Sequence, residues 1–432
     1  MPRAQRSRIV LCCTLIVLLS WPAPSGAYAV LSHEAIIDAI WATHIRPLLL
    51  KRFPIATPDE LRIAHGYSYG GAIIQDMGYY PHGSKFFSQL THYVRSGDFV
   101  AALLRGAQDI NEYAFALGAL AHFVADNEGH SRAVNRAVPL LYPELKKKYG
   151  DVVTYEKNPL AHVKTEFGFD VLEVAKERYA PDAYHEFIGF EVSRDLLDRA
   201  FEETYCLKLS DVLENETKAI GSYRHAVSTT IPKATRVAWQ LKQDDIMKDL
   251  PGMTRAKFLY NLSRASYEKS WGRDYRGPTL GEKIFAFLFR LIPKIGPLKV
   301  LTFRTPTPET EKMFEASFNS SLDAYRRLLA NPEASRAALP NENIDVGAET
   351  PAGEYRLKDE AYAELLHRLA KGQFFSVTPD LHADILRFYH DPAGPNTLKR
   401  HARRWAQVQQ ELARLKAAAP APSGVMRASE TN

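Results

Sequence analysis

The chain has 432 residues, of which 46% are hydrophobic and 24% charged, proportions typical of a folded globular protein rather than a disordered one. A formal charge of +5 at pH 7 is too small for a chain of this length to indicate nucleic-acid binding. Walker-type loops, Gly-x-Gly-x-x-Gly motifs and Cys-x-x-Cys pairs, the usual signals of nucleotide binding and thiol redox chemistry, are absent from the sequence. Histidines and carboxylates remain as the groups that carry chemistry.

The first 27 residues are typical of an export signal. Three arginines precede an apolar run of 13 residues from Ile9 to Trp21, which is shorter than the roughly 20 residues that span a bilayer. Small residues at Ser25 and Ala27 predict cleavage before Tyr28, and a second match predicts it before Val30. We expect a secreted or periplasmic mature protein with a formal charge near +2. The alternative is a segment that stays attached as a membrane anchor.

Cysteine usage excludes a disulfide scaffold. Cys12 and Cys13 leave with the signal, and Cys206 is then alone in the mature chain. A cysteine zinc finger is therefore excluded as well.

Apolar residues recur at helical spacing along most of the chain, and signals for strands are few. In chain order, the predicted helices follow Ser32, follow Asp98, run from Asn111 through Val124, and cover about 162–180, 184–204, 210–246, 254–269, 307–330, 358–370, 379–390 and 395–416.

This pattern predicts an all-α protein with a helical bundle and a small C-terminal helical appendage. The predicted organisation is a signal peptide (1–27), the bundle (28–330), a connecting segment (331–356), C-terminal helices (357–416) and a disordered tail (417–432).

Eight of the 14 histidines lie between His33 and His162. In the densest stretch, His122, Asp126 and His130 follow one another at i, i+4 and i+8, so on an α-helix all three project from one face. His162 and Glu166 repeat the i, i+4 spacing.

A single such pair is more often a packed, hydrogen-bonded histidine beside a carboxylate than a ligand set. Here several segments each offer a histidine or an acid, and Asp126 lies in an apolar turn without lysine or arginine, so a buried cation is the favoured interpretation. An imidazole-rich set without thiolate favours zinc, with manganese or iron second, over calcium or magnesium. A multinuclear centre of this kind suits hydrolysis of phosphoesters, in which a metal-activated water attacks phosphorus.

These residues resemble the zinc-dependent phospholipase C family, whose fold is shared with fungal zinc single-strand nucleases and with the N-terminal domain of glycosylphosphatidylinositol phospholipase D. The resemblance implies an all-α bundle that holds three zinc ions. In Gly118-Ala-Leu-Ala-His122-Phe-Val-Ala-Asp126, Asp126 matches the family carboxylate that bridges two zinc ions, and His130 matches the ligand that follows it. The gap of four residues before His130 is similar to that of the phospholipase D-like branch.

The resemblance also implies the remaining ligands. Tyr28, where the family usually has Trp, would bind zinc through its amino group and carbonyl, beside His33. Asp76, in the segment Gly71–Tyr80, would bind zinc and act as general base. The family's next histidine corresponds to His92, and its closing pair corresponds to His162 and Glu166.

We therefore expect an exported multinuclear zinc phosphodiesterase, a phospholipase C that holds two to three zinc ions and acts on phospholipids at a membrane surface. No nucleic-acid partner is expected, and no protein partner can be inferred. Two alternatives stay open: a single-strand nuclease or nucleotidase on the same fold, and a non-enzymatic exported binding protein with a structural metal.

Three further features have competing interpretations. Gly66-Tyr-Ser68-Tyr-Gly70 fits a nucleophile elbow, but that motif needs a strand before it and a helix after it. His82 could replace His92 as a ligand. The basic, apolar stretch Ile284–Leu301 fits either a core helix or an element that binds a lipid interface.

Overall fold

The computed structural model describes residues 29–176, 190–226, 238–239, 242–248, 250–255, 300–391, 395–418 and 420. Tyr28 and the export segment lie outside these residues, as do 284–299 of the basic apolar stretch and 256–269 of the predicted helix over 254–269. Among the described helices, none combines the length and apolar character that a membrane crossing needs.

The described residues form sixteen α-helices and no β-strand. In the first part of the chain the elements are α2 (Val30–Ile40), η1 (Trp41–Ile45), α3 (Arg46–Arg52), α4 (Pro58–Gly71), η2 (Ile74–Tyr79), α5 (Lys85–Tyr93), α6 (Ser96–Gly106), α7 (Ile110–Gly129), η3 (His130–Val134), α8 (Asn135–Leu141), α9 (Pro143–Tyr149) and α10 (Pro159–Ala175). They are followed by α12 (Arg194–Tyr205), η4 (Leu209–Asp211), α13 (Glu216–His225), α17 (Pro308–Ala330), α18 (Pro332–Ala337), α19 (Arg356–Lys371), α20 (Pro379–Phe388), η7 (Thr397–Arg400) and α21 (Ala402–Ala417).

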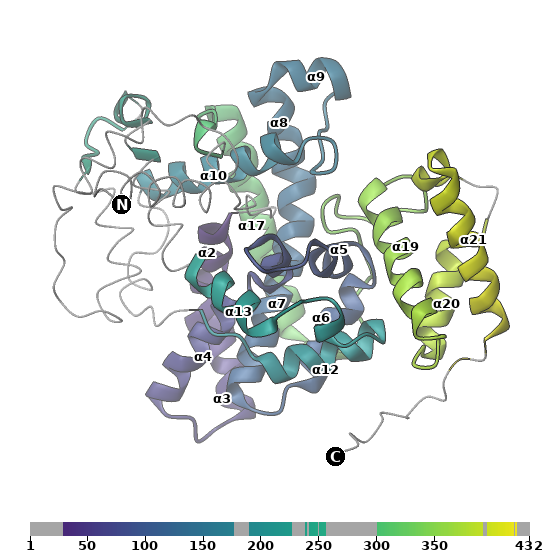
Figure 1. Cartoon of the computed structure of the whole chain (residues 1–432). Helices are drawn as coiled ribbons and strands as arrows, with labels where there is room; N and C mark the ends of the chain where they lie inside the picture. The colour runs from purple at the N-terminus through teal and green to yellow at the C-terminus, as the bar shows by residue number, and fades with distance from the viewer. Residues whose placement is uncertain are drawn as a thin grey trace, which may run out of the picture.

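Helix α7 is the central element of the bundle (Figure 1). Asp109 caps its N-terminus by accepting hydrogen bonds from the backbone N–H groups of Asn111 and Glu112, both at 2.8 Å. Because α7 is apolar on all sides, it can be buried on all sides, and α2, α4, α6 and α17 pack against it. Polar residues at its C-terminal half are therefore placed inside the protein.

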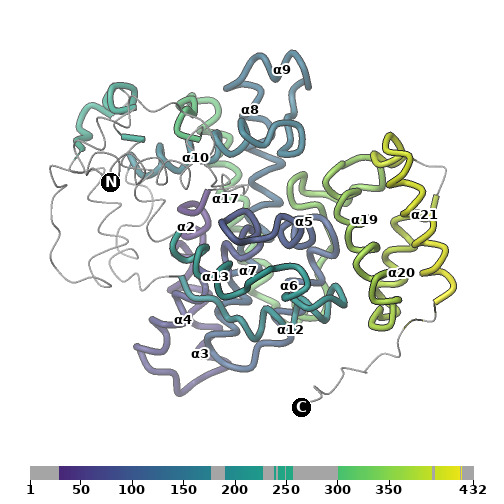
Figure 2. Tube along the Cα trace, viewed as in Figure 1, coloured from purple at the N-terminus to yellow at the C-terminus, as the bar shows by residue number. Residues whose placement is uncertain are grey.

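The C-terminal helices α19, α20 and α21 pack on one another at one side of the bundle, where α19 lies against α5 (Figure 2). One continuous apolar core extends from Val30 in α2 to Leu415 in α21. The segment between α18 and α19 runs along the bundle, with an isolated bridge between Asn343 and Ala348.

The all-α prediction is confirmed. Several predicted helices recur with small shifts, for example 307–330 as Pro308–Ala330 and 358–370 as Arg356–Lys371. Two are wrong in part: residues 190–193 of the predicted helix 184–204 precede α12, and residues 212–215 of the predicted helix 210–246 separate η4 from α13. The predicted domain boundaries stay a prediction.

Candidate metal centre

Helix α7 and the π turn η3 that follows it supply three residues of a buried cluster. His122, Asp126 and His130 are all 1% exposed or less. The Asp126 carboxylate oxygen Oδ2 lies 3.1 Å from Nε2 of His122 and 3.7 Å from Nε2 of His130. The i, i+4, i+8 spacing thus brings its three side chains to one place, as the sequence predicts.

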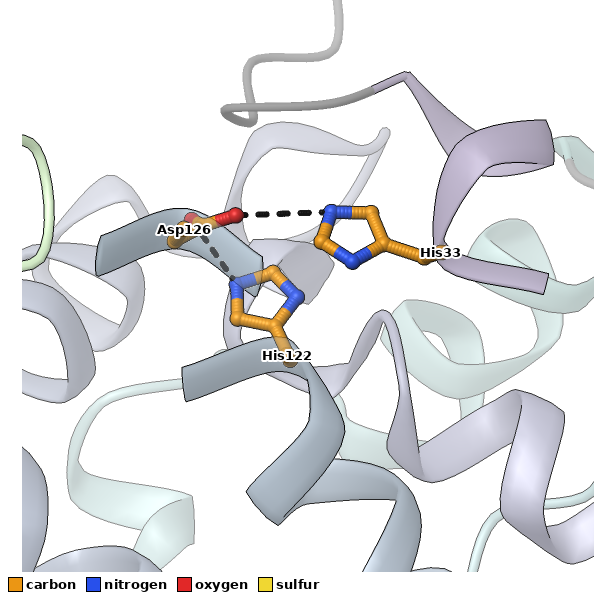
Figure 3. Close-up of side chains that lie close together, drawn as sticks. All are labelled: His33, His122 and Asp126. Atoms are coloured by element: carbon orange, nitrogen blue, oxygen red, sulfur yellow. Dashed lines mark ion pairs between the residues drawn. The ribbon is translucent and has the colours of Figure 1, made fainter. Parts of the chain in front are cut away.

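Asp126 also faces a histidine from α2 (Figure 3). Nε2 of His33 lies 3.5 Å from Oδ1 of Asp126, while His122 faces the other oxygen. The α2 end that carries His33 is held by Asp170, which accepts hydrogen bonds from the backbone N–H of Leu31 and the hydroxyl of Ser32. The two oxygens of Asp126 therefore face different imidazoles, which is the arrangement expected of a carboxylate that bridges two cations.

Asp76, in the 3₁₀ turn η2, and His92, at the end of α5, join the cluster from a third side. Nε2 of His92 lies 3.3 Å from Oδ1 of Asp76 and 3.5 Å from Oδ2 of Asp126. The Nδ1 atom of His92 lies 2.8 Å from the carbonyl of Ser88, and that of His122 lies 2.9 Å from the carbonyl of Ala72. Since a carbonyl can only accept, Nδ1 donates in both rings, and in the neutral imidazole Nε2 keeps a lone pair for a metal.

Helix α10 supplies the last two predicted side chains. Asn158 caps it by accepting from the backbone N–H of Ala161 at 3.0 Å. Nε2 of His162 lies 3.0 Å from Oε1 of Glu166 and 2.8 Å from Nδ1 of His130. These three side chains form a second group beside the one around Asp126.

The cluster fits metal ions better than a hydrogen-bonded network. Two ligands of one tetrahedral zinc ion, each about 2.0–2.1 Å from it, lie about 3.3 Å apart, close to the separations above. Within this cluster, three sets of ligand atoms lie within 4.8 Å of one another: His33, His122 and Asp126; Asp76, His92 and His122; and His130, His162 and Glu166. The buried atoms that make no hydrogen bond include Nε2 of His92 and His122, both oxygens of Asp126, Oδ1 of Asp76 and Oε1 of Glu166.

Charge balance supports the same conclusion. In the described part of the chain, the ion pairs of Asp76, Asp126 and Glu166 are all with histidines, never with lysine or arginine. Three buried carboxylates without a permanent cation are costly, and divalent ions would compensate them.

Burial and the neighbouring carboxylates shift the pKa values in this cluster. Burial lowers the pKa of His33 to about 3 and that of His162 to about 4, so both rings are neutral at pH 7. Burial also opposes a charge on His92, but its contacts with Asp126 and Asp76 outweigh this and raise its pKa to about 10. Burial raises the pKa of Glu166 well above its ordinary value.

Of the other candidates, neither Ser68 nor His82 belongs to the site. Ser68 lies inside α4, buried, with its hydroxyl donating to the carbonyl of Ala114 at 3.1 Å, so the strand that a nucleophile elbow needs is replaced by helix. His82 is exposed, with its backbone in the left-handed region at φ 62°, and His92 occupies the place in the cluster.

Sequence reasoning missed one acidic residue that reaches the cluster. Asp345 lies in the predicted connecting segment, is 3% exposed, and places Oδ1 3.4 Å from Nε2 of His130. The only local signal is the polar, turn-rich sequence around Ile344, and it does not distinguish a site residue from a loop.

Residues 32–214 match the family model described as zinc dependent phospholipase C. This range contains the eight described cluster residues that the sequence predicts, and it ends well before Asp345. No curated protein and no solved structure matches the chain.

Proposed function

Residues 32–214 form a domain of the zinc-dependent phospholipase C family, and we propose on that premise that the mature protein is an exported multinuclear zinc phosphodiesterase that hydrolyses phospholipids by C-type cleavage. The observation that carries this proposal is the convergence of four helices, a 3₁₀ turn and a π turn on one buried set of imidazoles and carboxylates. Within this set, Nε2 of His92 and of His122 and both oxygens of Asp126 make no hydrogen bond.

The proposed ligands divide among three ions. One ion would be held by Asp76, His92 and His122, and a second by His33 and Asp126. A third would be held by His130, His162 and Glu166. The amino group and carbonyl of Tyr28 would complete the second set, since in the sequence Tyr28 lies five residues before His33. This last assignment depends on export and cleavage before Tyr28, which we propose from the signal-like segment.

When bound, zinc polarises the phosphoryl oxygens and lowers the pKa of water. The chain's own residues orient the attacking water and the metal ligands, and accept a proton. Burial raises the pKa of Asp76, whose carboxylate we propose as the base that orients the attacking water and accepts its proton. The backbone carbonyls of Ser88 and Ala72 hold the rings of His92 and His122 in the tautomer that leaves Nε2 free.

The first test is metal content, measured by elemental mass spectrometry on protein exported and processed to its native N-terminus. We expect two to three zinc ions per chain. His122→Ala and Asp126→Ala should each lose zinc and lower phospholipid hydrolysis by more than the roughly 10–100-fold typical of residues that only support a ligand. His390→Ala, which removes an exposed histidine of the C-terminal region, is the matched control and should change neither.

The activity assay should separate the alternatives. Phosphatidylcholine vesicles should yield diacylglycerol and a phosphorylated headgroup, whereas phosphatidic acid would show D-type cleavage. Degradation of single-stranded DNA without lipid hydrolysis would assign the nuclease activity instead. Wild-type protein without zinc, or an Asp126→Ala variant with normal zinc and activity, would contradict the proposed site.

A further inference from the structure

The segment that precedes α19 is attached to the same elements that carry the metal-site histidines. The backbone N–H of Ile344 donates to the carbonyl of His92 at 3.1 Å. The side-chain amide of Asn135, directly after η3, donates to the carbonyl of Asp345 at 2.7 Å. Ser96 donates its hydroxyl to the carbonyl of Glu342 at 2.5 Å. These contacts fix the segment on α5, α6 and the end of the π turn.

Gly347 brings this segment into backbone contact with α7. A Cβ atom at Gly347 would lie 2.6 Å from the carbonyl oxygen of Asn127, the residue directly after Asp126. The backbone of Gly347 is also in the left-handed region, at φ 69°, which favours glycine. The approach is therefore part of the fold, and it places Asp345 beside the cluster.

The Asp345 carboxylate is held in a fixed orientation. Its Oδ2 accepts hydrogen bonds from the hydroxyls of Tyr93, at 2.8 Å, and Tyr355, at 2.5 Å. Both tyrosines are buried, and their rings contact one another with centroids 5.2 Å apart. Oδ1 is thereby directed to Nε2 of His130, 3.4 Å away.

The two nitrogens of His130 face different groups. Nδ1 faces Nε2 of His162 at 2.8 Å, on the side where Glu166 also lies. Nε2 lies nearer to Oδ1 of Asp345, at 3.4 Å, than to Oδ2 of Asp126, at 3.7 Å. An imidazole that binds a metal through one nitrogen commonly donates the N–H of the other to a carboxylate, which fixes the ring and raises its basicity.

We propose that Asp345 is a positioning residue of the metal centre: it accepts the Nε2 proton of His130, so that Nδ1 binds the ion shared with His162 and Glu166. The proposal rests on the metal centre proposed above, not on the substrate. It also makes the region beyond the family domain, which ends at residue 214, part of the functional unit.

The test compares Asp345→Asn with Asp384→Asn in the full-length protein. Asp384 is a matched control because it is likewise buried and accepts a tyrosine hydroxyl, from Tyr362 at 2.9 Å, but it lies in α20 and is absent from the metal cluster. Zinc affinity is measured by competition with a chelator, and the thermal midpoint is measured in parallel. The visible spectrum of the cobalt-substituted protein reports the ligand field.

We expect Asp345→Asn to lower the affinity for one zinc ion by roughly 10–100-fold and to change the cobalt spectrum. The affinities for the other ions, and all the properties of the Asp384→Asn protein, should stay as in the wild type. Tyr355→Phe removes one of the two hydrogen bonds to Oδ2 and should lower the affinity for the same ion by a smaller factor. This variant tests the proposal even if Asp345→Asn does not fold.

Two results would overturn the proposal alone: wild-type zinc affinity and cobalt spectrum in both Asp345→Asn and Tyr355→Phe, or an equal loss of zinc in Asp384→Asn, which would show a general effect of stability. Wild-type protein that binds no zinc would instead overturn the proposed metal centre itself, and this inference with it.

Discussion

The buried histidines of the cluster do not have the same protonation state. At pH 7 His33 and His162 are neutral, since burial lowers their pKa values to about 3 and 4, whereas the carboxylates around His92 raise its pKa to about 10. Glu166 has a raised pKa because it is buried. A group must lose its proton before it can bind zinc. Zinc binding therefore displaces a proton from the groups that are protonated at pH 7 and none from His33 and His162.

We predict that zinc binding at pH 7 releases protons, above all from His92. Below pH 10 the metal-free protein holds a proton there that zinc must displace, so zinc affinity falls as the pH falls, about tenfold per pH unit for each proton displaced. His33 and His162 contribute no release at pH 7, because they begin to bind protons only near pH 3–4. Isothermal titration calorimetry in buffers of different ionisation enthalpy measures the protons released. Binding heats that do not depend on the buffer would contradict the assignment.

At the scale of residues, helical spacing alone groups His122 with Asp126 and His162 with Glu166, because four residues bring side chains to the same helix face. Sequence reasoning cannot group Asp345 with His130 in this way, since 215 positions separate them and the contact depends on Gly347 passing close to α7. The family resemblance gives no help there, as the matched region ends at residue 214.

Among the elements, the crossing of α4 and α7 sets the geometry of the site. Cβ atoms at Gly118 and Gly71 would lie 2.1 and 2.0 Å from the backbone carbonyls of Ser68 and Phe115, so these glycines let the two helices touch backbone to backbone. The carbonyl of Ala72, at the end of α4, then reaches the ring of His122. Gly70 of the motif that resembles a nucleophile elbow serves a different contact, since a Cβ atom there would lie 1.9 Å from the backbone carbonyl oxygen of Glu191.

Gly118→Ala should therefore separate α4 from α7, because neither carbonyl belongs to a flexible side chain that can move away. We expect a destabilisation of about 1–3 kcal/mol or more, together with weaker zinc binding as Ala72 moves from His122. Gly221→Ala is the control: it lies inside α13 with nothing within 4 Å of its Cβ position, and should stabilise by roughly 0.5–1 kcal/mol. Thermal denaturation measures both. A Gly118→Ala protein as stable as wild type would show that the helices can move apart at no cost.

The end of α7 shows where helix prediction from sequence stops. The spacing predicts the helix itself, and its apolar character predicts its burial. Gly129 before His130 suggests a helix end that turns the ligand inward, yet Gly129 has right-handed helical angles, φ −66° and ψ −49°, and the chain continues as the π turn His130–Val134. Single π turns within helices often occur at functional sites. They depend on packing around one helical turn, which hydrophobic periodicity in the sequence does not detect.

At the scale of the whole molecule, the family domain does not contain all the contacts that hold its site. Helix α17, beyond the matched range, packs on α7 and donates the hydroxyl of Tyr325 to the carbonyl of Leu117 at 2.7 Å. Helix α19 packs on α5, which carries His92. The connecting segment and the C-terminal helices are thus coupled to the cluster through the elements that bear its ligands.

We predict that removing zinc loosens the connecting segment along with the site. Without the ion, His130 loses the constraint that keeps its ring against Asp345, and residues 339–355 should exchange their backbone amide protons faster, as should residues 118–134. Helix α21 packs on α19, α20 and η7 within the C-terminal region, and its exchange should change little. Hydrogen exchange with mass spectrometry, on zinc-loaded and chelator-treated protein, compares the three regions in one experiment. If 118–134 lost protection while 339–355 kept it, the segment would hold its place independently of the metal, and the coupling proposed through Asp345 would be excluded.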